Sequence, residues 1–583
     1  MPDAKTPPST SSILRGIAAS PGIGIGKAFV LKEEALSYVF RALSRDEVKR
    51  EIQRLRQAMA RTRNDIHATR DKVLKVLGKT HTGLIDVHLV ILDDPLFKDV
   101  EKKIAQEFMN AESALVAVLD EVGRKFDQIG DEFFRERKGD IMDVGRRIMR
   151  HLLGHESIQL SQLAERSIVI AHDLAPSDTI SLRDDLVEGF ATDIGGRTSH
   201  TAILAQGLEI PAVVGMKDIT AHVKTGDMLI VDGNDGRVFV NPNLTTLENY
   251  RKYREIQLAE TRELEKFRDL PAQTLDGRRV ILASNIENPE EIKAALGHGA
   301  EGIGLYRTEF LYLNRTTLPT EEEHYDNYSA VAHQMLPYSV IIRTVDLGGD
   351  KLGPLGVTGL DDEPNPFLGL RGIRLCLRYP DLFKTQLRAI LRASVEGKLK
   401  IMYPMITSVE EVRQANHLLN EVKDELRAKN VKFDAAIEVG VMIETPSAAV
   451  ISDILARETD FLSLGTNDLI QYTLAVDRIN ANVAPLYNPL HLGVLRLIGM
   501  VVKSAHDANK WVGMCGEMAG DPTFTKILLG LGLDELSVAA AAVPKIKRLI
   551  RESNDAEVQA LVKEVLQLTD HDSVLKRLAA RKI

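Results

Sequence analysis

One histidine lies in a segment whose residue types suit phosphoryl chemistry. His200 follows two glycines in the segment GGRTSHTA at 195–202, and the residues after it predict a helix that begins beside it. Unpaired N–H groups and the helix dipole favour negative charge at a helix N-terminus. An imidazole placed there could carry a phosphoryl group. Spacing alone also fits a structural or solvent-exposed histidine, so this interpretation needs support from the rest of the chain.

A second set of polar residues follows short β-rich runs in the C-terminal half. The set comprises Arg307, Arg343, Glu444, Asn467, Asp468, Cys515 and Glu517, with Lys351 and Arg478 in adjacent loops. Guanidinium groups bind phosphate and carboxylate in bidentate fashion, so several arginines on one rim suit a small anion that carries several charges. Glu444 and Asp468 are hard oxygen ligands of the kind that Mg²⁺ prefers. A single arginine could equally form a surface ion pair, but the whole set favours a site.

The two cysteines receive different interpretations. Cys515, in the run GMCGE, could be a small buried hydrophobe, as lone cysteines often are. Its predicted strand end nevertheless faces the proposed cation site, and a thiol with an ordinary pKa of about 8.5 is mostly protonated at neutral pH. Cys515 could therefore act as a proton donor. Cys376 lies in a helical stretch and is most simply structural.

Eight β-like runs position the second set of residues. The runs are 280–286, 302–311, 339–348, 399–406, 438–446, 460–469, 511–520 and 534–543. Helical segments separate them, and eight strand–helix units in about 310 residues have the size and period of a (β/α)8 TIM barrel. Active sites of such barrels lie at the C-terminal ends of the strands. We therefore expect the polar residues to meet on one rim.

The N-terminal half has a different pattern. Residues 13–32 predict a strand, a turn and a strand, and Ser44 with Glu47 forms a capping box that opens a helical region. Short β-rich runs return from about residue 161 and predict a compact α/β domain that ends near Pro242. One long charged helix follows and is stopped by Pro271, which makes it a natural linker.

Composition excludes several classes of function. The 583 residues include 74 Lys and Arg against 83 Asp and Glu, a net charge of −9 that disfavours nucleic acid as a partner. Two cysteines exclude a disulfide framework and fit a reducing cytosol. No apolar run approaches the roughly 20 residues that span a bilayer, and the Pro/Ser/Thr-rich start lacks the apolar stretch of a signal peptide. We expect a cytoplasmic multidomain enzyme with no membrane insertion.

Motifs spread along the chain resemble one family. They are SPGI at 20–23, GGRTSHTAILA at 195–205, GLYRTEFL at 304–311, RTVDLGGDK at 343–351, NPFLGLRGIR at 365–374, VMIETPSA at 441–448, GTNDLIQYTLAVDR at 465–478 and GMCGEMAGD at 513–521. In this order they closely resemble enzyme I of the bacterial sugar phosphotransferase system, a phosphoenolpyruvate–protein phosphotransferase. The resemblance extends from Ile17 to about residue 570.

The resemblance implies a role for each candidate residue. His200 would accept the phosphoryl group of phosphoenolpyruvate on Nε2, and Cys515 would protonate the enolate at its methylene carbon to give pyruvate. Glu444 and Asp468 would bind Mg²⁺. Thr179 matches a family threonine beside the histidine, although a generic turn residue fits that position nearly as well. The residues that would hold the substrate are Arg307, Arg343, Asn467, Asp468 and Arg478.

The resemblance also implies an arrangement of domains and partners. We expect a multidomain α/β protein whose swivelling phosphohistidine domain carries an inserted α-helical bundle, which binds the histidine phosphocarrier protein HPr. The barrel would bind phosphoenolpyruvate and form a homodimer. The predicted boundaries are a disordered tail at 1–12, the phosphohistidine domain at 13–43 and 151–243, the helical domain at 44–150, the linker helix at 244–271 and the barrel at 272–583.

Other functions fit parts of the sequence. Phosphoenolpyruvate synthases and pyruvate phosphate dikinases share two of these modules, but they carry a large nucleotide-binding domain where this chain has about 150 mostly helical residues. A metal-dependent aldolase or lyase would use the barrel and leave residues 13–242 unexplained. A scaffold or regulatory phosphocarrier would leave the barrel rim unexplained. We also expect no N-terminal sensor domain of the kind that a nitrogen-regulatory relative would add.

Overall fold

The chain forms two compact units in a computed structural model, residues 1–259 and residues 260–583, and each is described by itself. The structure describes residues 12–31, 38–77, 83–127, 132–154, 165–174, 186–196, 199, 201–202, 205, 210–312, 315, 317–348, 365–478, 480 and 482–580. Among the helices of these residues, none has the length and apolar character needed to cross a membrane.

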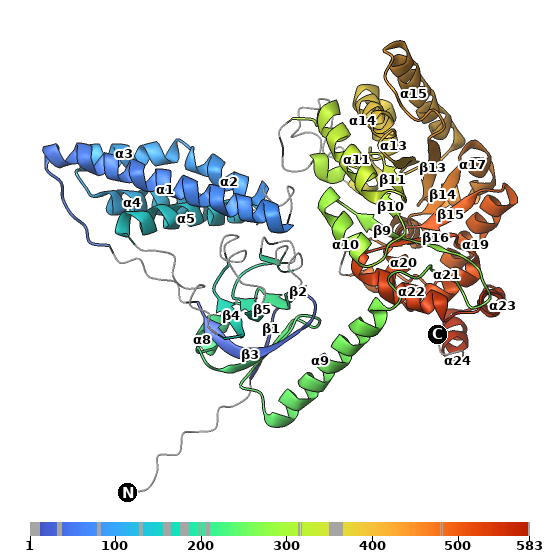
Figure 1. Cartoon of the computed structure of the whole chain (residues 1–583), viewed down its shortest axis with the longest axis horizontal. Coiled ribbons are helices and arrows are strands. Elements are labelled where there is room, and N and C mark those ends of the chain that lie inside the picture. The colour runs from blue at the N-terminus through green and yellow to red at the C-terminus, as the bar shows by residue number, and fades with distance from the viewer. Residues whose placement is uncertain are drawn as a thin grey trace, which may run out of the picture. The chain divides into compact units, whose positions relative to one another are not determined.

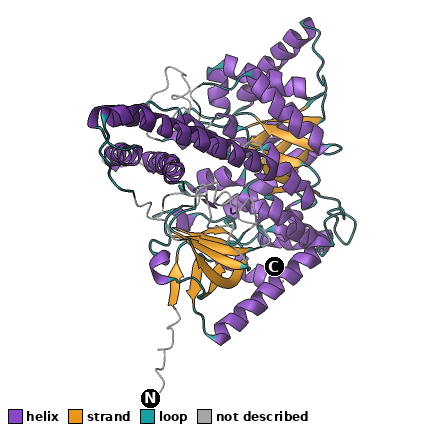
Figure 2. Ribbon diagram, turned by 60° about the vertical axis from the view of Figure 1, so that its left-hand side comes forward, coloured by secondary structure: helices purple, strands orange, loops and turns teal. Residues whose placement is uncertain are grey.

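Unit 1 is built on one eight-stranded sheet (Figure 1). Its strands are β1 (Ser12–Arg15), β2 (Ile17–Ser20), β3 (Ile23–Val30), β4 (Ser167–Ala171), β5 (Val187–Thr192), β6 (Ala212–Val214), β7 (Met228–Asp232) and β8 (Arg237–Val240). The order is β1-β8-β7-β3-β4-β5-β6-β2, and β3 to β6 run parallel. Figure 2 shows these strands gathered into one sheet. The β-rich runs predicted from about residue 161 are confirmed, whereas the segment predicted as a strand, a turn and a strand at 13–32 forms three strands, β1, β2 and β3.

A helical bundle is inserted between β3 and β4. Its helices are α1 (Arg45–Leu77), α2 (Gly83–Leu92), α3 (Leu96–Glu107), α4 (Ala111–Asp127) and α5 (Glu132–Leu153). The Ser44 N–H donates to the Glu47 carboxylate at 2.8 Å, which is the Glu half of the predicted capping box. Leu55, Ile66 and Val100 are among the fully buried residues of the bundle core. Because β3 pairs with β4 on either side of this insertion, the expected fold of an α/β domain with an inserted bundle is confirmed.

The predicted linker helix is α9 (Leu244–Glu265), which ends six residues before Pro271, and its first turns pack on the sheet of unit 1. Tyr250 Oη donates to Asp232 Oδ2 at 2.9 Å, and Arg254 pairs with Glu188 at 2.6 Å. A short helix, α8 (Ile219–His222), precedes β7. The division into two units does not test the predicted domain boundaries, which stay predictions.

Unit 2 is a closed barrel of eight parallel strands, so the predicted TIM barrel is confirmed (Figure 1). The strands are β9 (Ile281–Ile286), β10 (Ile303–Tyr306), β11 (Ser339–Arg343), β12 (Lys398–Tyr403), β13 (Glu438–Ile443), β14 (Phe461–Leu464), β15 (Trp511–Met514) and β16 (Glu535–Val538). Each strand lies within or beside one predicted run. Most of the strands stop several residues before the run does, and the remaining residues of each run form loops or the first turn of the next helix at the same end of the barrel.

Helices surround the barrel strands. They are α10 (Ile292–Gly297), α11 (Glu321–Met335), α13 (Ile373–Arg378), α14 (Pro380–Ala393), α15 (Val409–Ala428), α16 (Pro446–Val450), α17 (Ser452–Glu458), α18 (Thr466–Leu474), α19 (Leu492–Asp507), α20 (Glu517–Gly520), α21 (Thr525–Leu531), α22 (Val543–Arg551), α23 (Asp555–Val565) and α24 (His571–Ala580). Capping boxes begin two of the longer ones, with Thr320 and Glu323 at α11 and Ser408 and Glu411 at α15.

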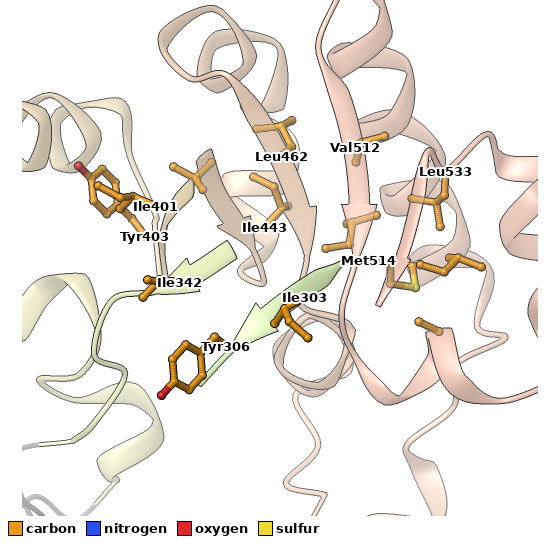
Figure 3. Packing of buried hydrophobic residues seen from close by; sticks show 14 of the residues in the cluster. Ile303, Tyr306, Ile342, Ile401, Tyr403, Ile443, Leu462, Val512, Met514 and Leu533 are labelled. Carbon is orange, nitrogen blue, oxygen red and sulfur yellow. The ribbon is translucent and has the colours of Figure 1, made fainter. Parts of the chain in front are cut away.

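Side chains of the barrel strands alternate between two apolar layers. Ile342, Ile401 and Leu462 belong to the large core that joins the strands to the surrounding helices (Figure 3). Their neighbours one position away, Ile341, Met402 and Phe461, belong to a separate cluster. Because successive side chains of a strand point to opposite faces, the second cluster fills the barrel interior.

The packing of the barrel interior can be tested around Phe461. Phe461 stacks on Trp511 with ring centroids 4.5 Å apart, and a Cβ added at Gly440 would overlap the Phe461 ring. Overpacking of this kind costs about 1–3 kcal/mol. We therefore expect Gly440→Ala to lower the urea midpoint of barrel unfolding, measured by fluorescence of Trp511, the single tryptophan of the chain.

Gly297→Ala in α10 is the matched control, because a Cβ there meets nothing within 4 Å. Replacing a helical glycine by alanine should leave the midpoint unchanged or raise it, by about 0.5–1 kcal/mol in free energy of unfolding. An unchanged midpoint in Gly440→Ala would contradict the described packing.

Candidate functional site

Strand alternation brings several predicted residues to the top of the barrel interior. Arg343 is the last residue of β11 and shares a face with Ile341, which lies inside. Glu444 follows β13 and continues the inward face of Met442. Cys515 follows β15 and belongs to the interior cluster itself. The period of two along each strand therefore directs these three side chains inward, at the end where barrel enzymes place their sites.

Three carboxylates meet at this end. Asp346, Glu444 and Asp468 each offer an oxygen, and these oxygens lie within 4.8 Å of one another. Glu444 and Asp468 were predicted as metal ligands, and Asp346 is an addition from the loop after β11. Burial, followed by the charges of Asp346 and Asp468, raises the pKa of Glu444 well above its ordinary value. The Met405 N–H donates to Glu444 Oε1 at 2.6 Å and fixes that carboxyl group.

Two buried arginines compensate this negative charge. Arg343 contacts Glu309 at 3.1 Å and Asp346 at 3.0 Å. Arg371 forms a bidentate pair with Asp346, at 3.1 and 2.8 Å, and reaches Asp468 at 3.2 Å. Burial disfavours the charge on both guanidinium groups, but the surrounding carboxylates outweigh it and raise their pKa values. Moving either arginine would break a close pair with a carboxylate of the cluster.

The charges of this cluster fit a divalent cation. Among the described residues of the cluster, the four carboxylates of Glu309, Asp346, Glu444 and Asp468, when ionised, exceed the two guanidinium groups by two charges. One divalent cation would neutralise that excess, and an all-oxygen donor set suits a hard ion. Burial first, and then the charges of Asp346 and Asp468, raise the pKa of Glu444, so a nearby positive charge would favour its ionised form. The residues present therefore fit a metal site.

The outer rim carries three further predicted residues, each held by an acidic neighbour. Arg307, just after β10, donates to Glu287 at 2.6 Å. Asn467 exchanges two hydrogen bonds with Glu517, at 3.1 and 2.9 Å. Arg478 lies 3.9 Å from the same carboxylate. These side chains are partly exposed, so an anionic ligand could displace the acidic partners and take their place.

Cys515 lies beneath this rim with its thiol protonated. Its side chain is 2% exposed, Ser463 Oγ donates to Sγ at 3.6 Å, and Sγ donates to the Leu464 carbonyl at 3.7 Å. Burial raises the pKa of the thiol to about 11, although Ser463 and the charge of Arg343 act in the opposite direction. A neutral thiol beside the cluster of carboxylates and guanidinium groups is a competent proton donor.

His200 lies outside the described residues, as do Thr179 and Lys351. Its described neighbours show how the turn is built. Gly195 has a φ of +121°, which favours glycine. Ser199 Oγ accepts from the Ala202 N–H at 3.4 Å, and Thr201, Ala202 and Ala205 are helical. The bond from the Ala202 N–H to Ser199 Oγ is typical of a helix N-cap residue.

Three residues of the cluster, Glu309, Asp346 and Arg371, were not predicted from the sequence. They lie in the quoted motifs GLYRTEFL, RTVDLGGDK and NPFLGLRGIR. A signal was present, because each motif places a charged residue among apolar and glycine residues. The pairing of Asp346 with Arg371, however, joins loops that are 25 residues apart, and neither of these two residues ends a predicted strand.

The environment of Cys515 predicts slow chemical modification. A thiol with a pKa of about 11 holds on the order of 10²-fold less thiolate at pH 8 than an ordinary one. In a Cys376→Ala variant, we expect native protein to react with a thiol-specific chromogenic disulfide at least that much more slowly than urea-unfolded protein. Equal rates in the two states would show that Cys515 is neither buried nor shifted. Wild-type protein serves as the control, since Cys376 is also buried.

Comparisons with known proteins assign the chain to a family. Three family models match: PEP-utilising enzyme, N-terminal (residues 15–137), mobile domain (163–236) and PEP-binding domain (261–555). A phosphoenolpyruvate-protein phosphotransferase of Priestia megaterium is 45% identical over 564 residues, covering 97% of this chain and 98% of the relative.

A phosphoenolpyruvate-protein phosphotransferase of Geobacillus stearothermophilus is 47% identical over 563 residues, covering 96% of this chain and 97% of the relative. An NMR solution structure of an Enzyme I protein matches with 44% identity and a TM-score of 0.36, covering 42% of this chain and 99% of that chain. The near-complete coverage of the two relatives shows that the chain belongs to the phosphoenolpyruvate-protein phosphotransferase family.

Proposed function

We propose that this enzyme transfers the phosphoryl group of phosphoenolpyruvate to Nε2 of its own His200 and then to HPr, with release of pyruvate. This would be the first step of a sugar phosphotransferase system. The observation that carries the proposal is the buried cluster of carboxylates and guanidinium groups at the C-terminal end of the barrel. It occurs in the region that matches the PEP-binding domain of PEP-utilising enzymes.

Phosphoenolpyruvate carries a phosphate and a carboxylate, and the proposed site offers cations for both. Arg307 and Arg343 would bind the phosphate, while Asn467 and Arg478 on the same rim would bind the carboxylate. Glu444 and Asp468 would hold a Mg²⁺ ion, with Asp346 close enough to contribute charge. When bound, Mg²⁺ would supply positive charge against the substrate oxygens. Phosphoryl transfer needs such positioning and neutralisation more than covalent chemistry by the protein.

Cys515 would complete the reaction at carbon. Transfer of the phosphoryl group to His200 breaks the bond between phosphorus and the enol oxygen and leaves an enolate. The Cys515 thiol would donate its proton to the methylene carbon and so form the methyl group of pyruvate. Its burial among apolar side chains supports this role, because it keeps the thiol neutral until an acceptor is present.

The remaining parts of the proposal rest on family membership. The helical bundle would bind HPr, and a homodimer would form through the barrel. His200 would have to reach both the barrel and HPr, so we propose that the phosphohistidine domain swivels, with α9 (Leu244–Glu265) as the connection. We also propose a cytoplasmic location.

The direct test of the proposal is labelling with phosphoenolpyruvate that carries ³²P. We expect wild-type protein to incorporate acid-labile, base-stable label in the presence of Mg²⁺, and none from ATP. His200→Ala should incorporate none, because the acceptor imidazole is missing. Equal incorporation in His200→Ala and wild type would exclude this histidine.

Two controls separate the acceptor from the metal site. Glu444→Gln lacks a proposed metal ligand, so it should take no label from phosphoenolpyruvate. It retains His200, so it should still accept label from phosphorylated HPr. EDTA should have the same effect on wild-type protein. Full labelling from phosphoenolpyruvate in Glu444→Gln would contradict the proposed metal ligand.

The proposed proton donor predicts a different pattern. Cys515→Ala should lose pyruvate formation on the order of 10²–10⁴-fold, the range of general acid catalysis. Phosphate exchange between HPr and His200 involves no enolate and should continue at the wild-type rate. Pyruvate release in a single turnover and HPr exchange are measured on the same preparation. Pyruvate formation at the wild-type rate would show that the thiol is only structural.

A further inference from the structure

A fully buried glutamine lies behind the site. Gln386 is on α14 (Pro380–Ala393), and none of its side chain is exposed. Its helix neighbours on the buried face, including Phe383, Leu387 and Ile390, are apolar. Burying an amide is costly unless its polar atoms are hydrogen-bonded. The hydrogen-bond partners of this side chain therefore show what the buried amide connects.

Gln386 makes three hydrogen bonds to three different elements. Its Oε1 accepts from the backbone N–H of Val345 at 3.0 Å, after β11. Its Nε2 donates to Thr308 Oγ1 at 3.1 Å, after β10, and to Tyr328 Oη at 3.0 Å, on α11. The backbone donor of Val345 determines the orientation of the amide, since only the oxygen can accept from it.

These contacts reach the loops that carry the proposed substrate arginines. Thr308 directly follows Arg307, and its Oγ1 donates to the carbonyl of Arg343 at 3.0 Å. Val345 directly precedes Asp346, whose N–H donates to Glu309 Oε1 at 2.9 Å. One side chain thus connects the Thr308 hydroxyl after β10 to the backbone after β11.

A chain of neutral groups supports Gln386 from the other side. Tyr328 Oη lies 2.9 Å from His324 Nδ1, and His324 Nε2 lies 3.3 Å from Tyr312 Oη. Burial lowers the pKa of His324 to about 4, so the ring is neutral near pH 7 and can accept on one nitrogen and donate on the other. Tyr328 Oη can therefore accept from Gln386 and donate to His324.

We propose that Gln386 is a positioning residue that sets the separation of Arg307 and Arg343 for the phosphate of phosphoenolpyruvate. It acts through Thr308 and Val345 and does not touch the substrate. This inference rests on the proposed function, because it assumes that the two arginines bind the phosphate. A glutamine that only stabilised the core would need no bonds to these two loops.

Gln386→Met tests the proposal, because methionine keeps the unbranched shape and removes all three hydrogen bonds. We expect KM for phosphoenolpyruvate to rise and kcat/KM to fall by on the order of 10²-fold, as loss of alignment near an active site does. Phosphate exchange between HPr and His200 should keep its wild-type rate, because it does not use the barrel site.

Two further variants distinguish positioning from stability. Leu387→Ala on the same helix should lower the unfolding midpoint reported by Trp511 and leave kcat/KM at the wild-type value. Thr308→Val should reproduce the loss in kcat/KM. The double variant that combines Gln386→Met with Thr308→Val should lose no more kcat/KM than the more impaired single variant, because both changes break the same connection.

The outcomes separate the inference from the function on which it rests. If wild-type protein takes no label from phosphoenolpyruvate, the proposed function is wrong and the inference falls with it. If wild type is labelled but Gln386→Met and Thr308→Val both keep the wild-type kcat/KM, only the positioning role is overturned. If Gln386→Met fails to fold, Thr308→Val decides: a raised KM supports the role, and an unchanged KM overturns it.

Discussion

Closure of the parallel barrel is the constraint on which the rest of unit 2 depends. The ladder between β16 and β9 joins strands about 250 residues apart and puts all eight C-terminal strand ends on one rim. Asn285 shows the consequence, since its side chain donates to the Cys515 carbonyl at 3.0 Å and accepts from Ser537 at 2.7 Å. The candidate site exists only because these ends converge.

Convergence creates an electrostatic problem as well as a site. Asp346, Glu444 and Asp468 come close together in a buried region, where like charges repel strongly. Arg343 and Arg371 offset part of this repulsion through close pairs. The remaining negative charge favours binding of a cation. A bound cation would in turn favour an anionic substrate, in agreement with a family that acts on phosphoenolpyruvate. The neutral network around Gln386 lies behind it, so the arginines are supported without added charge.

Local patterns predicted the parts of the structure that depend on local physics. The eight β-like runs of the barrel each contain or adjoin one observed strand, and Ser44 with Glu47 correctly marked the start of a helix. Arg343, Glu444 and Cys515 were found because each lies within a predicted β-like run, and each ends or directly follows the observed strand. Asp346 and Arg371 were missed because they lie in loops, where no period assigns a side chain to a face. The roles of the candidate residues, His200 included, stay predictions.

By itself, the sequence determined the types and order of the elements, the barrel class and the motifs that reveal the family. These follow from hydrophobic period, capping residues and motif spacing, which act over a few residues. Only the tertiary structure decided which side chains meet. Arg371 reaches Asp468 across 97 positions, and Gln386 reaches Thr308 across 78. Such contacts depend on how helices pack against a closed barrel, and no local pattern encodes that geometry.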